Sequence, residues 1–109
     1  MNLNIKLLGQ LRPAATTAEI IFSPRTGSQV VLTSIYICNL SSSKKEYSLY
    51  FDNDGTTYDE TTALAFETEI QGNTTAIVEI EIPLRNSAGG FAVQTSSAND
   101  INFTLFGEE

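Results

Sequence analysis

The sequence predicts an all-β protein: a single antiparallel β-sandwich domain of about eight short strands over residues 1–109. Apolar residues recur at every second position through most of the chain, which is the strand period. Clusters of Gly, Asn, Asp, Ser and Pro separate these runs at the spacing typical of sandwiches and barrels, and β-branched residues are frequent. Jelly-roll and immunoglobulin-like strand orders both fit this pattern, so the sequence leaves the strand order open.

Four runs alternate clearly between apolar and polar residues, and each predicts a strand with one face in the core. They are residues 46–51, 64–70, 78–82 and 101–105. In the second run, the alternation assigns Leu64 and Phe66 to the core and Glu67 and Glu69 to solvent.

Four further runs predict strands with a less regular pattern. Leu3, Ile5 and Leu7 form the first, Ile20 with Phe22 the second, and residues 91–93 a short one near the end. Residues 30–38 are apolar on both faces. Such a run fits a central strand, or a strand whose outer face meets a second subunit. A single helical turn is expected between Tyr58 and Ala63.

The acidic composition disfavours two classes of partner. Thirteen acidic residues against six basic ones give a net charge of −7, and the basic residues are scattered. A phosphate backbone and an anionic membrane surface would both be repelled, so no nucleic-acid or membrane partner is predicted. No secretion signal is recognised at the N-terminus, which predicts synthesis in a cytoplasm without export.

The sequence offers little for catalysis, and no enzymatic activity or cofactor is predicted. Histidine is absent and Cys38 is the single cysteine, which excludes Ser/His and Cys/His nucleophile pairs, histidine-based metal centres and an intrachain disulfide. Two glutamate pairs, Glu67 with Glu69 and Glu79 with Glu81, could suggest a glycoside hydrolase. Their alternation with core residues places them on a solvated face, which argues against acid–base work.

The segment FDNDGTTYDE, residues 51–60, could be a metal site or a turn. If Asp52 and Asp54 occupy the third and fifth positions of a helix–loop–helix calcium loop, Tyr50 and Thr61 replace the carboxylates at its two ends. That site is rejected. Turn chemistry is favoured, because Asp and Asn bond their own backbone and Asp-Gly is a common turn pair. An irregular calcium site is kept as the minor alternative, with the ligands Asp52, Asp54, Asp59 and Glu60.

Several apolar residues fall on the solvent-facing phase of their strands or near the chain ends, which suggests a contact surface. Self-association is the default explanation for such a surface, and a trimer is the oligomer expected. A sugar-binding platform of tyrosines is the less favoured alternative, since the sequence lacks tryptophan. The interface candidates are Leu3, Ile5, Leu8, Tyr36, Tyr50, Ile77 and Phe106.

Four short motifs carry a resemblance to a known group of proteins. They are Leu8-Gly9-Gln10, Pro13-Ala14-Ala15-Thr16-Thr17, Ile37-Cys38-Asn39 and Phe106-Gly107-Glu108-Glu109. Together they resemble small structural proteins of tailed bacteriophages, common in phages of marine and freshwater bacteria. The resemblance covers most of the chain, and because its motifs are structural, it carries over no site residue.

The resemblance implies a non-enzymatic part of a virion, made in the cytoplasm of the host bacterium. A head decoration or cement protein, or a collar protein, is the first expectation. It would bind copies of itself and other virion proteins, such as the major capsid or tail proteins. The alternative is a tail-fibre or baseplate component, or a carbohydrate- or receptor-binding module.

Overall fold

Eight strands and one turn of 3₁₀ helix make up the described part of the chain, residues 5–27, 29–84 and 87–109 of a computed structural model. Each predicted strand is present, and the expected helical turn is the short element η1. The elements are β1 (Ile5–Leu11), β2 (Glu19–Phe22), β3 (Val30–Asn39), β4 (Lys45–Asp52), η1 (Glu60–Thr62), β5 (Ala63–Ile70), β6 (Thr75–Leu84), β7 (Gly90–Thr95) and β8 (Ile101–Glu108).

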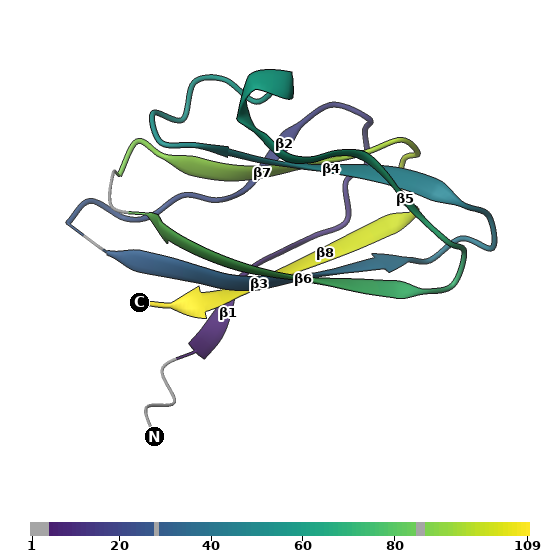
Figure 1. Cartoon of the computed structure of the whole chain (residues 1–109), viewed down its shortest axis with the longest axis horizontal. Helices are drawn as coiled ribbons and strands as arrows, with labels where there is room; N and C mark the ends of the chain where they lie inside the picture. Colours follow the sequence, from purple (N-terminus) through teal and green to yellow (C-terminus); the bar gives the residue numbers. More distant parts are fainter. Residues whose placement is uncertain (1–4, 28, 85–86) are drawn as a thin grey trace.

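The strands form two four-stranded antiparallel sheets, stacked face to face as in Figure 1. One sheet has the order β1-β8-β3-β6 and the other β2-β7-β4-β5. The first strand therefore pairs with the last, the second with the seventh, the third with the sixth and the fourth with the fifth. This nested pairing of eight strands is the jelly-roll order. It decides between the two orders that the sequence left open.

The core lies between the sheets and is built by the inward phase of the central strands. On β3 the side chains of Leu32, Ile35 and Ile37 are fully buried, and on β8 those of Phe103 and Leu105 are too. Burial removes about 1.5–3 kcal/mol of unfavourable hydration for each large side chain. The strict alternation of β8, buried at every second residue, shows the period that the sequence predicted.

The predicted orientation of the β5 side chains is wrong for Leu64 and Phe66. These side chains are 50% and 44% exposed, although the alternation assigned them to the core. The pairing of β4 with β5 shifts register between Tyr47 and Leu49, and Glu67 has φ of 48°. Such a bulge adds one residue and reverses the alternation on one side of it. Ile70 consequently points inward, whereas Leu64 and Phe66 point outward.

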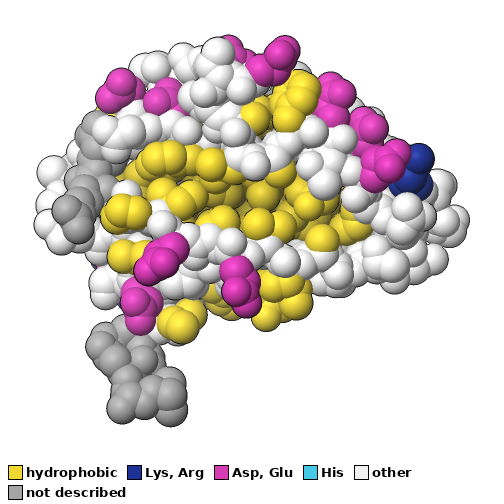
Figure 2. Space-filling model, in the orientation of Figure 1, with side chains coloured by type: hydrophobic (Ala, Val, Ile, Leu, Met, Phe, Trp, Pro, Cys, Tyr) yellow, Lys and Arg dark blue, Asp and Glu magenta, His cyan; other side chains and the backbone are white. Residues whose placement is uncertain are grey.

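The two long sides of the sandwich are closed to different degrees. On one side β1 and β2 meet so closely that a Cβ on Gly9 would lie 2.5 Å from the carbonyl oxygen of Ile21. On the other side lie the edge strands β5 and β6, and Figure 2 shows hydrophobic side chains as a continuous band between the two sheets there. No helix in the described residues is long and apolar enough to span a membrane.

Candidate interaction surfaces

An apolar strip crosses the outer face of the sheet β1-β8-β3-β6. Residues paired across neighbouring strands point to the same face, and the register aligns Leu7 with Phe106, and Tyr36 with Ile77. Ile5 joins them at the start of β1. We call this set the outer strip; its members are Ile5, Leu7, Tyr36, Ile77 and Phe106. Leu7 and Ile77, near its two ends, are 53% and 56% exposed.

The middle of the outer strip is an aromatic pair beside a shallow groove. The rings of Tyr36 and Phe106 meet edge to face, with centroids 5.5 Å apart and planes at 73°. This is the favoured geometry for two aromatic rings, so the pair is a preformed, rigid apolar patch. The groove has a volume of about 560 Å³, and its lining combines apolar residues with Glu79, Glu81 and Glu108.

The structure places four of the interface candidates on the outer strip. These are Ile5, Tyr36, Ile77 and Phe106; their role in binding stays a prediction. Leu3 lies outside the described residues. Leu7, which is 53% exposed, was not among the interface candidates, although it has the same phase in the first strand as the candidate Ile5.

Leu8 and Tyr50 do not lie on this surface, which corrects the prediction. Leu8 directly follows the outward-facing Leu7, so strand alternation turns it inward, and it packs against the core. Tyr50 is 1% exposed, and its hydroxyl bonds the side chain of Gln94 on β7. A tyrosine whose ring is covered by neighbouring residues and whose hydroxyl is hydrogen-bonded can occupy a strand position that polar residues usually hold.

A second apolar surface lies at the open side of the sandwich, and we call it the seam. It consists of inward-facing residues of β5 and β6 that are only partly covered: Ala65, Ala76, Val78, Ile80 and Ile82. Sequence reasoning missed it, because alternation predicts which residues point inward and not whether the sheets cover them. The small side chain of Ala65 on β5 covers little of the longer side chains on β6.

The acidic loop after β4 is held together by its own hydrogen bonds. The Asp52 carboxylate accepts from the backbone N–H groups of Thr57 (2.7 Å), Thr56 (2.9 Å) and Asp54 (3.1 Å). These bonds hold the pKa of Asp52 below its usual value. Gly55 donates to the Asp52 carbonyl and has φ of 68°, so the predicted turn chemistry is confirmed.

The two other acidic residues proposed as calcium ligands lie in the next turn. Asp59 caps η1, and its carboxylate accepts from the hydroxyl and the backbone N–H of Thr61, which lowers the pKa of Asp59. Glu60 is exposed in the first turn of η1. Among the described residues, no group of three Asp, Glu or Cys side chains is arranged to hold a metal ion.

The acidic loop lies against the loop that precedes β7. A Cβ on Gly55 would fall 1.8 Å from the carbonyl oxygen of Ala88, so the two backbones touch. Likewise, the hydroxyl of Tyr58 would lie 2.2 Å from a Cβ on Gly90. Burial, together with the nearby charge of Asp52, raises the pKa of Tyr58. These contacts fix the two loops as one unit at one end of the sandwich.

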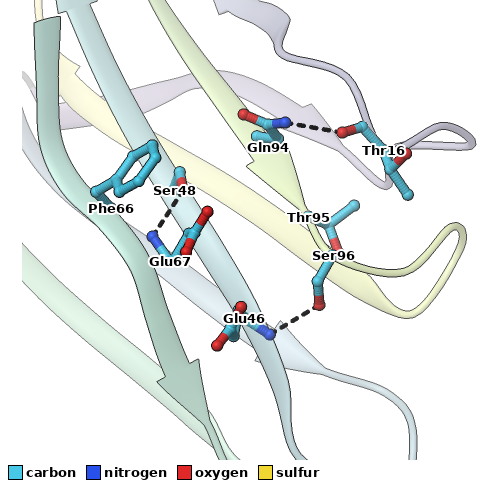
Figure 3. Close-up of a pocket in the computed structure, with 8 residues that line it drawn as sticks. All are labelled: Thr16, Glu46, Ser48, Phe66, Glu67, Gln94, Thr95 and Ser96. Atoms are coloured by element: carbon cyan, nitrogen blue, oxygen red, sulfur yellow. Dashed lines mark hydrogen bonds between the residues drawn. The ribbon is translucent and has the colours of Figure 1, made fainter. Parts of the chain in front are cut away.

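The outer face of the second sheet carries a small hollow of about 170 Å³ (Figure 3). Phe66 stands at one side of it, and polar side chains line the rest: Thr16, Glu46, Ser48, Glu67, Gln94, Thr95 and Ser96. Hydrogen bonds fix two of these side chains. The Gln94 amide donates to the Thr16 carbonyl (2.8 Å), and the Ser48 hydroxyl accepts from the backbone N–H of Glu67 (2.9 Å). The hollow thus places one aromatic side chain beside fixed polar groups, and its volume is below the roughly 300–1,000 Å³ of typical ligand pockets.

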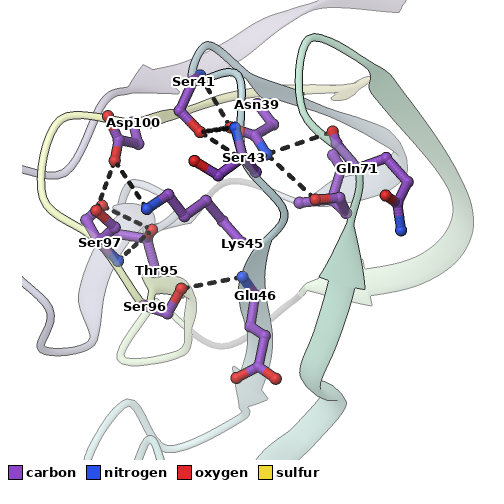
Figure 4. A network of polar contacts seen from close by, with 11 residues as sticks. Asn39, Ser41, Ser43, Lys45, Glu46, Gln71, Thr95, Ser96, Ser97 and Asp100 are labelled. Carbon is purple, nitrogen blue, oxygen red and sulfur yellow. Dashed lines mark hydrogen bonds and ion pairs between the residues drawn. The ribbon is translucent and has the colours of Figure 1, made fainter.

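A buried asparagine organises the opposite end of the sandwich (Figure 4). Asn39 is fully buried, and its amide nitrogen bonds the carbonyls of Ser43 (2.8 Å), Ile70 (3.1 Å) and Gln71 (3.3 Å). Its side-chain oxygen accepts from the N–H and hydroxyl of Ser41. Asn39 therefore joins the end of β3, the β3–β4 loop and the connection from β5 to β6, which crosses from one sheet to the other. This is a structural role.

Comparisons with known proteins add two solved structures. Structures of Tobacco streak virus coat protein are similar to the chain at 10% identity and a TM-score of 0.47, and at 9% and 0.46 for one described as the coat protein dimer. The first covers 100% of this chain and 89% of the viral chain, the second 97% and 85%. No protein-family model matches the sequence, and no curated protein matches it.

Proposed function

We propose that the chain is a non-enzymatic structural protein of a bacteriophage virion. Its role is that of a head decoration (cement) or collar protein, which stabilises the particle by self-association and by contact with other virion proteins. It is made in the cytoplasm of the host bacterium, and its partners are further copies of itself, with a trimer as the guess, and the major capsid or tail proteins.

The observation that carries this proposal is the outer strip. Strand pairing in a sheet fixes the positions of its five apolar side chains, and Ile5, Leu7, Tyr36 and Ile77 are each more than 40% exposed. A contiguous apolar patch on a rigid sheet is typical of a protein contact surface. The four motifs that resemble phage structural proteins support the same class: one of them contains Phe106 of the strip, and two others begin directly after Leu7 and Tyr36.

The test is to bind the purified protein to phage particles that lack it. Wild-type protein is expected to sediment with the particles and to raise their resistance to heat. Ile77→Asp, which places a charge in the strip, should abolish co-sedimentation, because burying an unpaired charge at an interface is costly. Leu64→Asp is the matched control, since Leu64 is similarly exposed on the other sheet. Full binding by Ile77→Asp, or particles that never take up the wild-type protein, would refute the proposal.

A receptor- or carbohydrate-binding module of a tail fibre or baseplate is the second candidate. The hollow beside Phe66 favours it, since an aromatic face with polar neighbours suits a sugar ring. Binding to a glycan array that is lost in Phe66→Ala and kept in Leu64→Ala would support this function. Absence of binding to any glycan on the array would count against the sugar alternative. A melting temperature that neither calcium nor a chelator changes would count against the calcium alternative.

A further inference from the structure

The two edges of the sheet β1-β8-β3-β6 carry opposite charges. β1 contains Lys6 and is followed by Arg12, and residues 5–18 include no Asp or Glu. β6 contains Glu79 and Glu81 and no Lys or Arg. All four charged side chains are exposed. Lys6 pairs with its own Glu109 at 3.0 Å, but a pair this exposed contributes little and can exchange partners.

The directions of the strands suit these two edges to each other. Each neighbouring pair in the sheet is antiparallel, so β1 and β6 run in opposite directions. A second copy placed edge to edge, continuing the sheet, would therefore bring its β1 antiparallel to β6 of the first. Antiparallel addition of a strand to a sheet edge satisfies backbone groups that are otherwise unpaired.

The outer strip also runs from one edge to the other. It begins on β1 with Ile5 and Leu7, which are 58% and 53% exposed, and ends on β6 with Ile77, which is 56% exposed. If the sheet continues from copy to copy, the apolar end on β1 comes to lie beside the apolar end on β6. The two ends of the strip then cover each other at the junction, whereas in a single copy both ends are exposed to solvent.

Other edge pairings are less favourable. Pairing β6 with β6 brings Glu79 and Glu81 against their own copies, and pairing β1 with β1 does the same for Lys6; like charges across strands destabilise a sheet. In the other sheet, β2 has four residues and β5 is bulged at Glu67. Short and bulged edges are poor templates for a further strand.

We propose that copies of this chain join edge to edge, with β1 of one copy added antiparallel to β6 of the next over residues 75–82. Pro83 limits the ladder at its end, because proline has no N–H to donate. The contact is head-to-tail, so repeating it gives a closed ring or a filament and not a two-fold dimer. This inference rests on the self-association in the proposed function and names the surfaces that make it.

Disulfide trapping between two differently sized versions of the protein tests the pairing. In a Cys38→Ser background, one version carries Leu7→Cys and the other carries Ile77→Cys, Glu79→Cys or Glu81→Cys. Oxidation is expected to link Leu7→Cys to at least one of the β6 variants and to give little product when any variant is alone. Leu64→Cys on β5 is the control and should not link to Leu7→Cys. Absence of a mixed product, or equally abundant products from single variants, would overturn the inference.

Charge reversal gives an independent readout by analytical ultracentrifugation. Glu79→Lys with Glu81→Lys should raise the dissociation constant of self-association roughly tenfold or more, because it puts like charges across the junction. Glu67→Lys with Glu69→Lys on β5 changes the net charge equally and should have little effect. An equal loss in both double variants would mean that net charge, and not the β1–β6 junction, controls assembly.

The outcomes separate this inference from the proposed function. Oligomers that form without a β1–β6 crosslink refute the edge pairing and leave a virion role standing. Protein that never binds phage particles refutes the virion role, whichever way its copies associate.

Discussion

The two long sides of the sandwich, the closed side at β1 and β2 and the open side at β5 and β6, cover their inward-facing side chains differently. At β1 and β2, a glycine lets one sheet come into direct backbone contact with the other, and the hydrophobic side chains beside that contact are still only partly buried. At β5 and β6, the inward residues Val78, Ile80 and Ile82 stay partly exposed as the seam (Figure 2). A jelly-roll thus does not bury its inward phase uniformly: coverage depends on how closely the sheet edges approach, which strand periodicity does not encode.

The largest difference is expected between two isoleucines that both point inward. Ile35 is fully buried, and Ile35→Ala should lower the free energy of unfolding by about 2–5 kcal/mol. Ile80→Ala in the seam should cost only about 1 kcal/mol, since part of that side chain is in water already. Urea unfolding of both variants measures the difference. Equal losses would mean that the seam is as well packed as the centre.

The β5–β6 connection on the open side is held by hydrogen bonds as well as by close backbone contact between Gly72 and Ser42. Asn39→Ala leaves the carbonyl of Ile70 without its buried side-chain donor, and we expect it to cost about 2–3 kcal/mol; the Gln71 carbonyl keeps its hydrogen bond from the Thr74 hydroxyl. Asn53→Ala, an exposed asparagine in a loop, is the control and should be near neutral. A neutral Asn39→Ala would show that the crossing does not depend on this side chain.

The contrast between the sides can be tested by adding a methyl group to each. Gly9→Ala should destabilise the closed side by about 1–3 kcal/mol, because its Cβ meets backbone that cannot move aside easily. Ala65→Val in the seam adds apolar volume where space is open, and is expected to be neutral or slightly stabilising. Thermal unfolding compares the two. A tolerated Gly9→Ala would mean that the sheets can separate at that side without loss.

The smallest effect concerns the loop that leads into the open edge strand β5. Because hydrogen bonds lower the folded-state pKa of Asp52, its carboxylate stabilises the fold at neutral pH. That stabilisation is present above the ordinary aspartate pKa and is lost as pH falls through the lower folded value. Asp52→Asn should therefore flatten the fall in melting temperature under acid. Asp54→Asn, whose carboxylate accepts no hydrogen bond from the described residues, should leave the acid profile as in wild type.

The motifs behind the phage resemblance turn out to have specific packing roles. Leu8 packs on Gly107, because a Cβ on that glycine would lie 2.5 Å from Cδ1 of Leu8. Gly9, which also lacks a Cβ, allows β1 to approach the backbone of Ile21 on β2 at the closed side. Asn39 ties three segments together at one end. The sequence showed that these residues form recognisable groups, but their partners are distant along the chain and became known only from the fold.

By itself, the sequence determined that the chain is an antiparallel sandwich of about eight short strands, and it favoured a turn over a calcium site for the acidic segment. These features depend on local periodicity and turn chemistry, which neighbouring residues specify. The tertiary structure decided the jelly-roll order, the outward turn of Leu64 and Phe66, the burial of Tyr50 and the exposure of the seam. Those depend on bulges and on the approach of distant strands, because a single added residue reverses which face a side chain occupies.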